Sequence, residues 1–347
     1  MARRRLEAAL QVSRSINKES EWKKKFEKDP VIKKIEPDFE KEGIFSLQFS
    51  YDGEILAAGY GNFGVQVFDA SNGKPMGDAV KSRYGGLATT CIRFNPKHQN
   101  VLYAASSEGT VHACDLSKGH DQLIIEEKGN EINCLDFSLD GYSFATAGKD
   151  LNVRLYDSQT NQLLKTFKGY SPLTQAPDNP KAGHAMRIFA LKYHPEYNQI
   201  FVTAGWDSTL KIWDARANDG VVRSIKGPHI CGDSLDIRGY RILTGSWVAN
   251  HALQLWDYTE GKLLKDIPFP HGGAGEFLYT AQFLNDICVI AGGSGTNSVQ
   301  VISSDTNECL GTIEMGNKPV QALDTTLGGA RIAVGSGDSI VKLVSLA

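Results

Sequence analysis

The sequence predicts an all-β fold, a seven-bladed propeller built from repeats of four short strands. Three observations predict it. A phrase of three strands and their turns recurs seven times, each time closed by a pair such as Trp213-Asp214. The second members of successive closing pairs lie 46, 42, 57, 43, 46 and 42 residues apart. A strand-like segment also precedes the first repeat. A period in the forties with four strands per repeat is typical of a propeller rather than a sandwich.

The repeat from Arg187 to Asp214 shows the strand pattern most clearly. Residues Ile188–Tyr193 alternate between apolar and polar side chains, residues Ile200–Gly205 form a buried run, and residues Leu210–Asp214 return after a turn. The same phrase ends at seven closing pairs, which are Phe68-Asp69, Cys114-Asp115, Tyr156-Asp157, Trp213-Asp214, Trp256-Asp257, Ile302-Ser303 and Val344-Ser345. Each repeat therefore supplies three strands before its closing pair.

A fourth strand follows the closing pair in several repeats, and the last repeat borrows its own from elsewhere. These outer segments are Leu163–Lys168, Val221–Lys226, Leu263–Pro268 and Cys309–Glu314. No such segment follows Val344-Ser345, whereas a matching one, Val31–Glu36, precedes the first repeat. We expect it to pair with the last repeat and close the ring, which removes open sheet edges. Deleting residues 1–37 should then destabilise the ring, and deleting residues 1–28 should not.

The chain resembles the WD-repeat family over residues 31–347, most closely where Gly183-His184 precedes a first strand and Trp213-Asp214 closes the third. The resemblance implies a hydrogen-bonded tetrad inside one blade, formed by His184, Thr203, Asp207 and Trp213. Other repeats keep only parts of it. The position of Asp207 is held elsewhere by Asn62, Glu108, Asp150, Asp338 and Thr296, and the fifth repeat carries an insertion around Ala249-Asn250.

The tetrad has a structural and a catalytic interpretation. His184, Asp207 and Thr203 look superficially like a nucleophilic triad, but Trp213 would make the group a lock between a turn and a strand, and we favour that interpretation. The segment Gly59–Gly64 fits a dinucleotide fingerprint, yet a strand follows it instead of a helix. The sequence therefore predicts no enzyme activity, no cofactor and no metal site.

Composition agrees with one large β domain, residues 31–347, that follows a basic extension, residues 1–30. With 41% hydrophobic residues and 35 glycines, the chain can bury a core and form many turns. No apolar run approaches membrane-spanning length, and the beginning of the chain lacks a signal core. The six cysteines form no Cys-x-x-Cys pair, which favours free thiols in a reducing, cytoplasmic compartment.

Two tryptophans are the first candidates for partner binding. Trp206 precedes the turn residue Asp207, and Trp247 aligns with it in the next repeat, so we expect them side by side near one rim of the channel. Aromatic residues are favoured anchors in interfaces, although both could equally pack against nearby loops. Lys149 holds the same position in the third repeat. The proline-rich insertion 169–182 is a second candidate binding loop or a passive surface insertion.

The extension is the third candidate. Residues 3–28 carry nine basic and four acidic residues, a net charge of +5, against −8 for the remainder of the chain. Trp22 and Phe26 stand at i and i+4 of a weak helical pattern. This charge run is either a solvated face or a surface that docks on an acidic protein such as tubulin, with nucleic acid less favoured. Its candidate partner-binding residues are Arg3, Arg4, Arg5, Trp22, Lys23, Lys24 and Lys25.

The sequence predicts a non-enzymatic scaffold for protein association. A cytoskeletal or ciliary assembly, such as the axoneme, is the role that the basic extension suggests. The alternative is a peptide-reading subunit of a nuclear or cytoplasmic regulatory complex, whose channel accepts an Arg or Lys side chain at the top face of the propeller.

Overall fold

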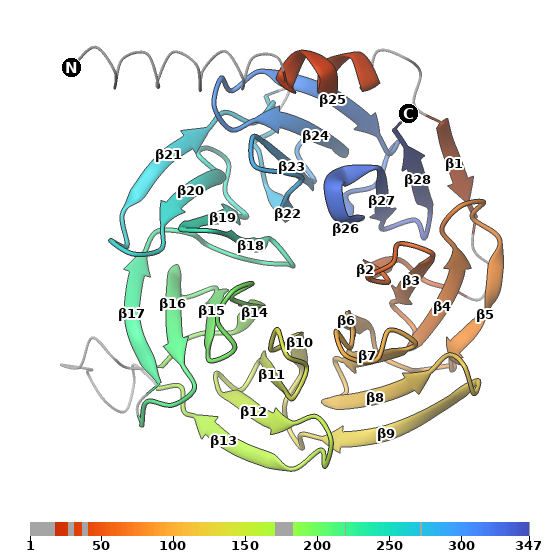
Figure 1. Ribbon diagram of the computed structural model, residues 1–347, viewed down its shortest axis with the longest axis vertical. Coiled ribbons are helices and arrows are strands. Elements are labelled where there is room, and N and C mark those ends of the chain that lie inside the picture. The colour runs from red at the N-terminus through yellow and green to blue at the C-terminus, as the bar shows by residue number, and fades with distance from the viewer. Residues whose placement is uncertain are drawn as a thin grey trace.

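The computed structural model describes residues 18–26, 31–36, 41–170, 183–218, 220–270 and 273–346. These residues form seven four-stranded antiparallel sheets arranged as blades around a central channel (Figure 1). The predicted seven-bladed propeller is therefore confirmed.

Each blade contributes one strand to each of four concentric positions. The inner strands are β2 (Ile44–Phe49), β6 (Thr89–Phe94), β10 (Ile132–Phe137), β14 (Ile188–Tyr193), β18 (Leu235–Arg238), β22 (Leu278–Phe283) and β26 (Val320–Thr325). The second strands are β3 (Ile55–Tyr60), β7 (Val101–Ser106), β11 (Ser143–Gly148), β15 (Ile200–Gly205), β19 (Arg241–Gly245), β23 (Cys288–Gly293) and β27 (Arg331–Ser336). The third strands are β4 (Gly64–Asp69), β8 (Thr110–Asp115), β12 (Val153–Asp157), β16 (Thr209–Asp214), β20 (Leu253–Asp257), β24 (Ser298–Ser303) and β28 (Val341–Ser345). The outer strands are β5 (Pro75–Val80), β9 (His120–Glu126), β13 (Leu163–Phe167), β17 (Val221–Lys226), β21 (Leu263–Ile267), β25 (Cys309–Glu314) and β1 (Val31–Ile35).

The seventh blade takes its outer strand from the beginning of the chain. Strand β1 pairs antiparallel with β28, from Val31 opposite Ser345 to Ile35 opposite Val341. Figure 1 shows β1 beside β28, close to the C-terminal end. The strand ends at Ile35, one residue before the end of the segment that the sequence indicates. The pairing covers the edge of β28, completes blade seven with a fourth strand and joins two segments that lie far apart in the chain.

The core lies between neighbouring blades. The second strands are almost wholly buried, since they are covered on both faces, whereas outer strands such as β13 and β21 are largely exposed and bury only their last residue. Large side chains such as Phe68, Phe144 and Trp213 are fully buried between sheets. This packing holds the blades in fixed positions around the channel, so side chains on the inner strands and on the turns meet at its two mouths.

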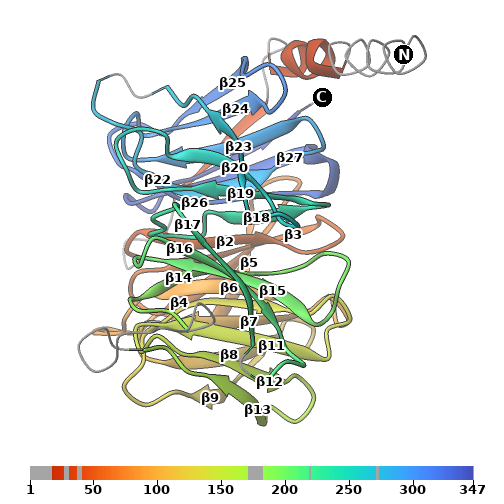
Figure 2. The ribbon, with the colours of Figure 1, turned by 90° about the vertical axis from the view of Figure 1, so that its left-hand side faces the viewer.

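Residues 18–26 are helical and pack on the propeller itself. The side chains of Trp22 and Phe26 are half-buried against the apolar cluster of blades six and seven, and Phe26 lies over Gly311 of β25. Glu19 is buried and accepts hydrogen bonds from Ser303 (2.5 Å) and Thr306 (3.3 Å). Figure 2 shows the helix outside the ring, next to β25.

In the part of the extension that the structure describes, the helix packs on the chain's own propeller, an arrangement that neither sequence-based interpretation includes. Partner binding by the extension stays a prediction. Trp22 packs against the apolar core of blades six and seven. Lys23 forms an ion pair with Glu308 (2.5 Å), and Lys24 is exposed. Lys25 lies over the ring of Trp22 at 5.2 Å. Arg3, Arg4 and Arg5 lie outside the described residues, as does the segment 171–182 of the proline-rich insertion.

None of the helices in the described part of the chain is long and apolar enough to cross a membrane.

Candidate functional site

The three candidate positions on the propeller turns hold equivalent places in their blades. The backbone N–H of Trp206 donates to the carbonyl of Arg187 (3.0 Å), that of Trp247 to His229 (2.8 Å), and that of Lys149 to Glu131 (3.0 Å). Each bond ties the turn between the second and third strands to the residues that precede the inner strand. We call the side of the ring that carries these turns the top face, and the opposite side the bottom face.

The two tryptophans are each packed on a different aromatic neighbour. The ring of Trp206 lies 5.0 Å from that of Phe189, and Trp206 keeps 36% of its surface exposed. The ring of Trp247 lies 5.2 Å from Phe277 and 6.4 Å from Tyr279, with 39% of Trp247 exposed. The two tryptophans occupy equivalent turns of neighbouring blades, and among the described residues no ring contact joins them. The sequence left open whether these rings are interface anchors or pack against nearby loops. Each ring packs on an aromatic neighbour and also keeps more than a third of its surface exposed.

The top mouth of the channel is a cavity of about 280 Å³ that the partners of both tryptophans line. Phe189, the neighbour of Trp206, and Tyr279, the neighbour of Trp247, both face it, together with Phe45 and Cys231. Phe45 is 41% exposed. The aromatic rings of blades one, four and six therefore surround one opening, which a side chain from outside can enter.

A short ion network joins Lys149 to this mouth. The carboxylate of Glu131 binds the ammonium of Lys149 (2.5 Å) and the guanidinium of Arg187 (2.6 Å). The hydrogen bond from Lys149 is the main reason why the pKa of Glu131 is lowered, with Arg187 adding to it. Arg187 also lies over the ring of Trp206 at 5.8 Å. Lys149 and Trp206 thus belong to one continuous stretch of the rim.

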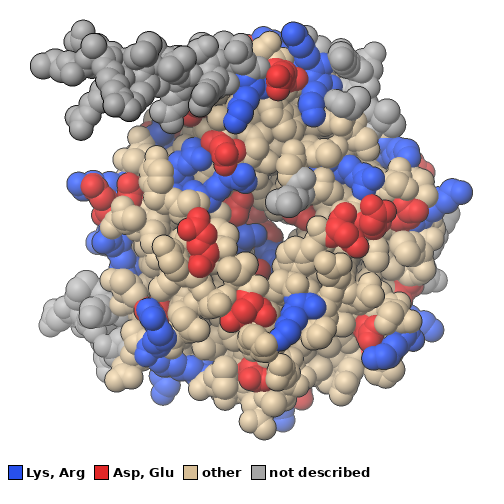
Figure 3. Space-filling model, viewed as in Figure 1, with Lys and Arg blue, Asp and Glu red and all other residues tan. Residues whose placement is uncertain are grey.

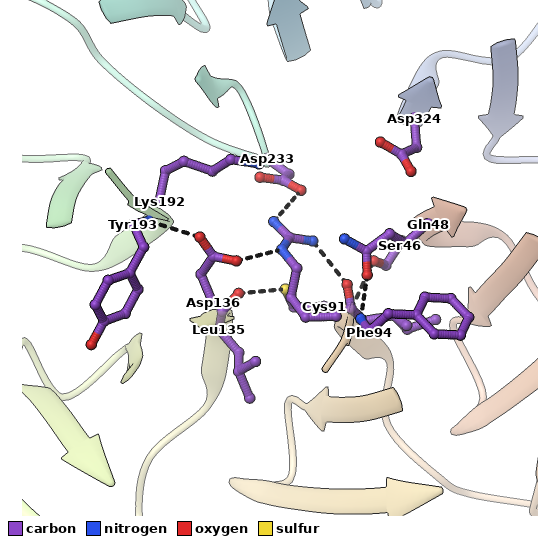
Figure 4. A network of polar contacts seen from close by, with 12 residues as sticks. Ser46, Gln48, Cys91, Phe94, Leu135, Asp136, Lys192, Tyr193, Asp233 and Asp324 are labelled. Atoms are coloured by element: carbon purple, nitrogen blue, oxygen red, sulfur yellow. Dashed lines mark hydrogen bonds and ion pairs between the residues drawn. The ribbon is translucent and has the colours of Figure 1, made fainter. Parts of the chain in front are cut away.

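Deeper in the channel, each inner strand contributes one polar side chain at an equivalent position. We call this set the channel belt; it consists of Gln48, Arg93, Asp136, Lys192, Asp236, Gln282 and Asp324. Figure 4 shows part of it from close by, and Figure 3 shows acidic and basic side chains around the central opening. The sequence analysis missed the belt, although a polar residue near the end of each first strand was its visible signal.

Most belt residues bridge neighbouring blades. Gln48 accepts a hydrogen bond from the backbone N–H of Phe94 in the next blade (2.5 Å), and Asp324 accepts one from Phe49 (2.7 Å). Asp136 and Asp236 make the same kind of bond, to Tyr193 (2.7 Å) and Phe283 (2.8 Å). A side-chain acceptor therefore satisfies a backbone donor that would otherwise face the channel.

The two basic belt residues cannot accept hydrogen bonds, so they pair with carboxylates instead. Arg93 binds Asp233 (2.8 Å) and lies 3.4 Å from Asp136, while Lys192 lies 3.9 Å from Asp236. Burial would raise the pKa of Asp233, but the charges of Arg93 and Lys192 outweigh it and lower that pKa. Burial raises the pKa of Asp136, which those two cations only partly offset. Counting Asp233 and Asp324, the channel holds four carboxylates against these two cations.

Asp324 is expected to make stability depend on pH. Burial raises its pKa to about 6, above the value near 3.8 of a free side chain. The folded protein therefore binds this proton more tightly, and the stability that it contributes is present below about pH 4 and is lost as the pH rises through 6. We expect Asp324→Asn to remove this loss, up to about 3 kcal/mol, because an amide oxygen can accept from Phe49 as Gln48 does from Phe94. Chemical denaturation at pH 5 and 7.5 measures the effect; equal destabilisation of the variant at both pH values would contradict it.

The four residues of the implied tetrad lie together in blade four. Trp213 donates from Nε1 to Oγ1 of Thr203 (2.7 Å), which lies 2.7 Å from Nε2 of His184, and Nδ1 of His184 lies 2.8 Å from Asp207. Because the carboxylate of Asp207 can only accept, Nδ1 of the neutral His184 ring carries the proton and donates to it. Nε2 is then an acceptor, so the Thr203 hydroxyl donates to Nε2 while it accepts from the indole N–H of Trp213. His184 is wholly buried, and burial lowers its pKa despite the nearby carboxylate. A neutral imidazole with both nitrogens satisfied serves structure.

Other blades replace the tetrad with their own networks. In blade five, Trp256 donates to Thr244 (2.9 Å) without a histidine in the chain of bonds. In blade three, the buried carboxylate of Glu127 accepts from Thr146 (2.5 Å) and Tyr156 (3.0 Å). Thr146 and Tyr156 stand where blade four has a threonine and a tryptophan, so their alignment was the signal for Glu127, which the sequence analysis missed.

Within the described ranges, His, Cys, Asp and Glu side chains nowhere gather in a group of three or more that could hold a metal ion.

Fold and repeat pattern together define a WD-repeat β-propeller protein. The pattern of the family described as WD domain, G-beta repeat matches residues 118–157, which span β9 and the first three strands of blade three, and residues 179–214, which run to the closing pair of blade four.

The chain is similar to several curated WD-repeat proteins. It is 23% identical over 228 residues to "Cell division cycle 20.1, cofactor of APC complex" of Arabidopsis thaliana, which covers 63% of this chain and 46% of that protein. It is 21% identical to "WD repeat-containing protein slp1" of Schizosaccharomyces pombe, covering 65% of this chain and 43% of that protein. Human Coronin-7 is 36% identical over 97 residues, 28% of this chain and 10% of its own length. The matched part spans less than half of each relative.

Proposed function

We propose that the protein is a non-enzymatic protein-binding module that holds a segment of a partner at the top mouth of its channel. One observation carries the proposal: the exposed rings of Trp206 and Trp247 stand beside aromatic residues that line the same cavity. Partly exposed aromatic rings around a pocket are frequent anchors in protein interfaces. Beneath them, the channel holds more carboxylates than cations, which favours a segment that carries an Arg or Lys side chain.

The finer role that we propose is that of a peptide-reading subunit in a regulatory complex. One relative at low identity supports it, since its name describes a cofactor of the APC complex. A cytoskeletal or ciliary scaffold has less support, because residues 18–26 dock on the propeller instead of facing an acidic surface such as tubulin. The buried free thiols of Cys91 and Cys134 agree with a reducing compartment, and we propose the cytoplasm.

The test is selection of peptides from a random display library on the purified full-length protein. We expect enrichment of sequences with a basic residue, and we expect the double variant Trp206→Ala, Trp247→Ala to lower their affinity by tenfold or more. Tyr240→Ala is the matched control, because Tyr240 is an exposed aromatic residue (57%) in a turn on the bottom face. Unchanged enrichment on the double variant, or equal loss on Tyr240→Ala, would overturn the proposal.

A further inference from the structure

One position on the outer strand of each blade faces the next blade. A side chain at this position can cover the outer end of the boundary between the two blades. This position lies opposite the residue two places before the end of each third strand. In three blades it is a lysine that donates to the carbonyls of a turn in the next blade: Lys33 to Ser71 (2.7 Å), Lys165 to Ala217 (2.5 Å) and Lys265 to Ser304 (2.8 Å). We call it the bridging position.

Two blades have glycine at the bridging position, Gly311 in blade six and Gly77 in blade one. At Gly311 the chain's own helix takes the space, since a Cβ there would lie 2.3 Å from Cγ of Phe26. At Gly77, apart from its two chain neighbours, no atom of the described residues lies within 4 Å of the place that a Cβ would occupy. Beside Gly77 the seam between blades one and two opens into a groove of about 380 Å³.

This groove repeats the floor of the site that the helix covers. Its residues Val67, Cys114 and Leu116 hold the positions of Val301, Val344 and Leu346 in blades six and seven. The latter three belong to the apolar cluster on which Trp22 and Phe26 pack. The volume of the groove beside Gly77, about 380 Å³, exceeds the roughly 150 Å³ that can hold one benzene ring in an apolar cavity.

The charges beside the two sites are different. In blade six, Ser303 donates to Glu19 of the helix, and Glu308 pairs with Lys23. In blade one, Asp69 stands in the place of Ser303, and Lys74 in the place of Glu308. A helix with the charges of residues 18–26 would therefore bring Glu19 to an aspartate and Lys23 to a lysine, which is unfavourable at both contacts.

We propose that this groove is a second docking site, which accepts an amphipathic helix of a partner protein with aromatic residues at i and i+4. The helix carries a basic residue where the chain's own helix has Glu19 and an acidic residue where it has Lys23. The site is on the outer rim, between blades one and two, and is independent of the top mouth. A second copy of this chain is not the occupant, because its helix has the opposite charges.

The probe is a synthetic peptide with the sequence of residues 13–29 and the exchanges Glu19→Lys and Lys23→Glu, linked to hold a helix. A peptide with the natural sequence is its control. Fluorescence anisotropy on the full chain should show saturable binding of the exchanged peptide, at least tenfold tighter than that of the natural one. A photo-reactive group in place of the Phe26 ring should label residues beside Gly77, in β5 and the turn after β8.

Two surface variants distinguish binding in the groove from non-specific binding to exposed apolar side chains. Met76 is 59% exposed and borders the groove, and Leu164, 57% exposed, holds the same strand position in blade three. We expect Met76→Glu to weaken binding tenfold or more and Leu164→Glu to leave it unchanged, while Trp206→Ala with Trp247→Ala also leaves it unchanged. Equal binding of both peptides, labelling beside Gly311, or no effect of Met76→Glu would overturn the proposal.

Discussion

Removal of residues 1–37 is expected to lower the free energy of unfolding by on the order of 5 kcal/mol, because it takes away β1 and the docked helix together. The five pairs between β1 and β28 close blade seven, and Ile35 is buried in the adjoining core. Their loss leaves β28 as an open edge, which promotes association between chains. Thermal melting and light scattering on the purified truncated protein measure both effects.

Removal of residues 1–28 should have an intermediate effect, about 2–3 kcal/mol, since it keeps β1 but loses the half-buried Trp22 and Phe26. The sequence alone predicts no effect for this truncation, and the docked helix is the reason for the change. If both truncated proteins melt at the same temperature as the full chain, neither β1 nor the helix stabilises the ring.

Much of the fold could be predicted because it repeats. The phrase that ends at Trp213-Asp214 recurs, so each blade supports the assignment of the others, and the displaced strand Val31–Ile35 is recognisable by its likeness to outer strands. The tetrad could be placed because blade four keeps its residue types. These features depend on local pattern and on position within a repeat, which a single sequence displays.

What could not be predicted depends on contacts between segments far apart in the chain. Trp22 and Phe26 indicate a helical face. In the structure, Phe26 packs on Gly311 and Trp22 packs on Gly329, where the missing side chains leave room for the two rings. A glycine in a sequence does not show that a ring from a distant segment fills the space beside it. The channel belt was missed for a related reason: Arg93 meets Asp233 across the channel, 140 residues later. Shape and charge across such distances appear only once the ring is closed.

Substitution of His184 by alanine is expected to cost about 2–3 kcal/mol, because the hydroxyl of Thr203 and the carboxylate of Asp207 lose their buried partner. Asp207→Ala should cost a similar amount. The double variant should be less destabilised than the sum of the two, by about 1 kcal/mol, since both side chains belong to one network. Denaturant unfolding of the four proteins at pH 7.5 gives the coupling energy.

The same variants should respond to pH in a definite direction. Burial lowers the pKa of His184 below its ordinary 6.5, so the unfolded chain binds this proton more tightly than the folded one. The stability that the neutral imidazole contributes is present above about pH 6.5 and is lost as the pH falls toward its folded pKa. The cost of His184→Ala should therefore shrink between pH 7.5 and pH 5.5. A cost that is constant across this range, or additive effects of the two single variants, would show that the neutral imidazole of His184 and the carboxylate of Asp207 do not form the buried pair that joins the turn of blade four to its strands.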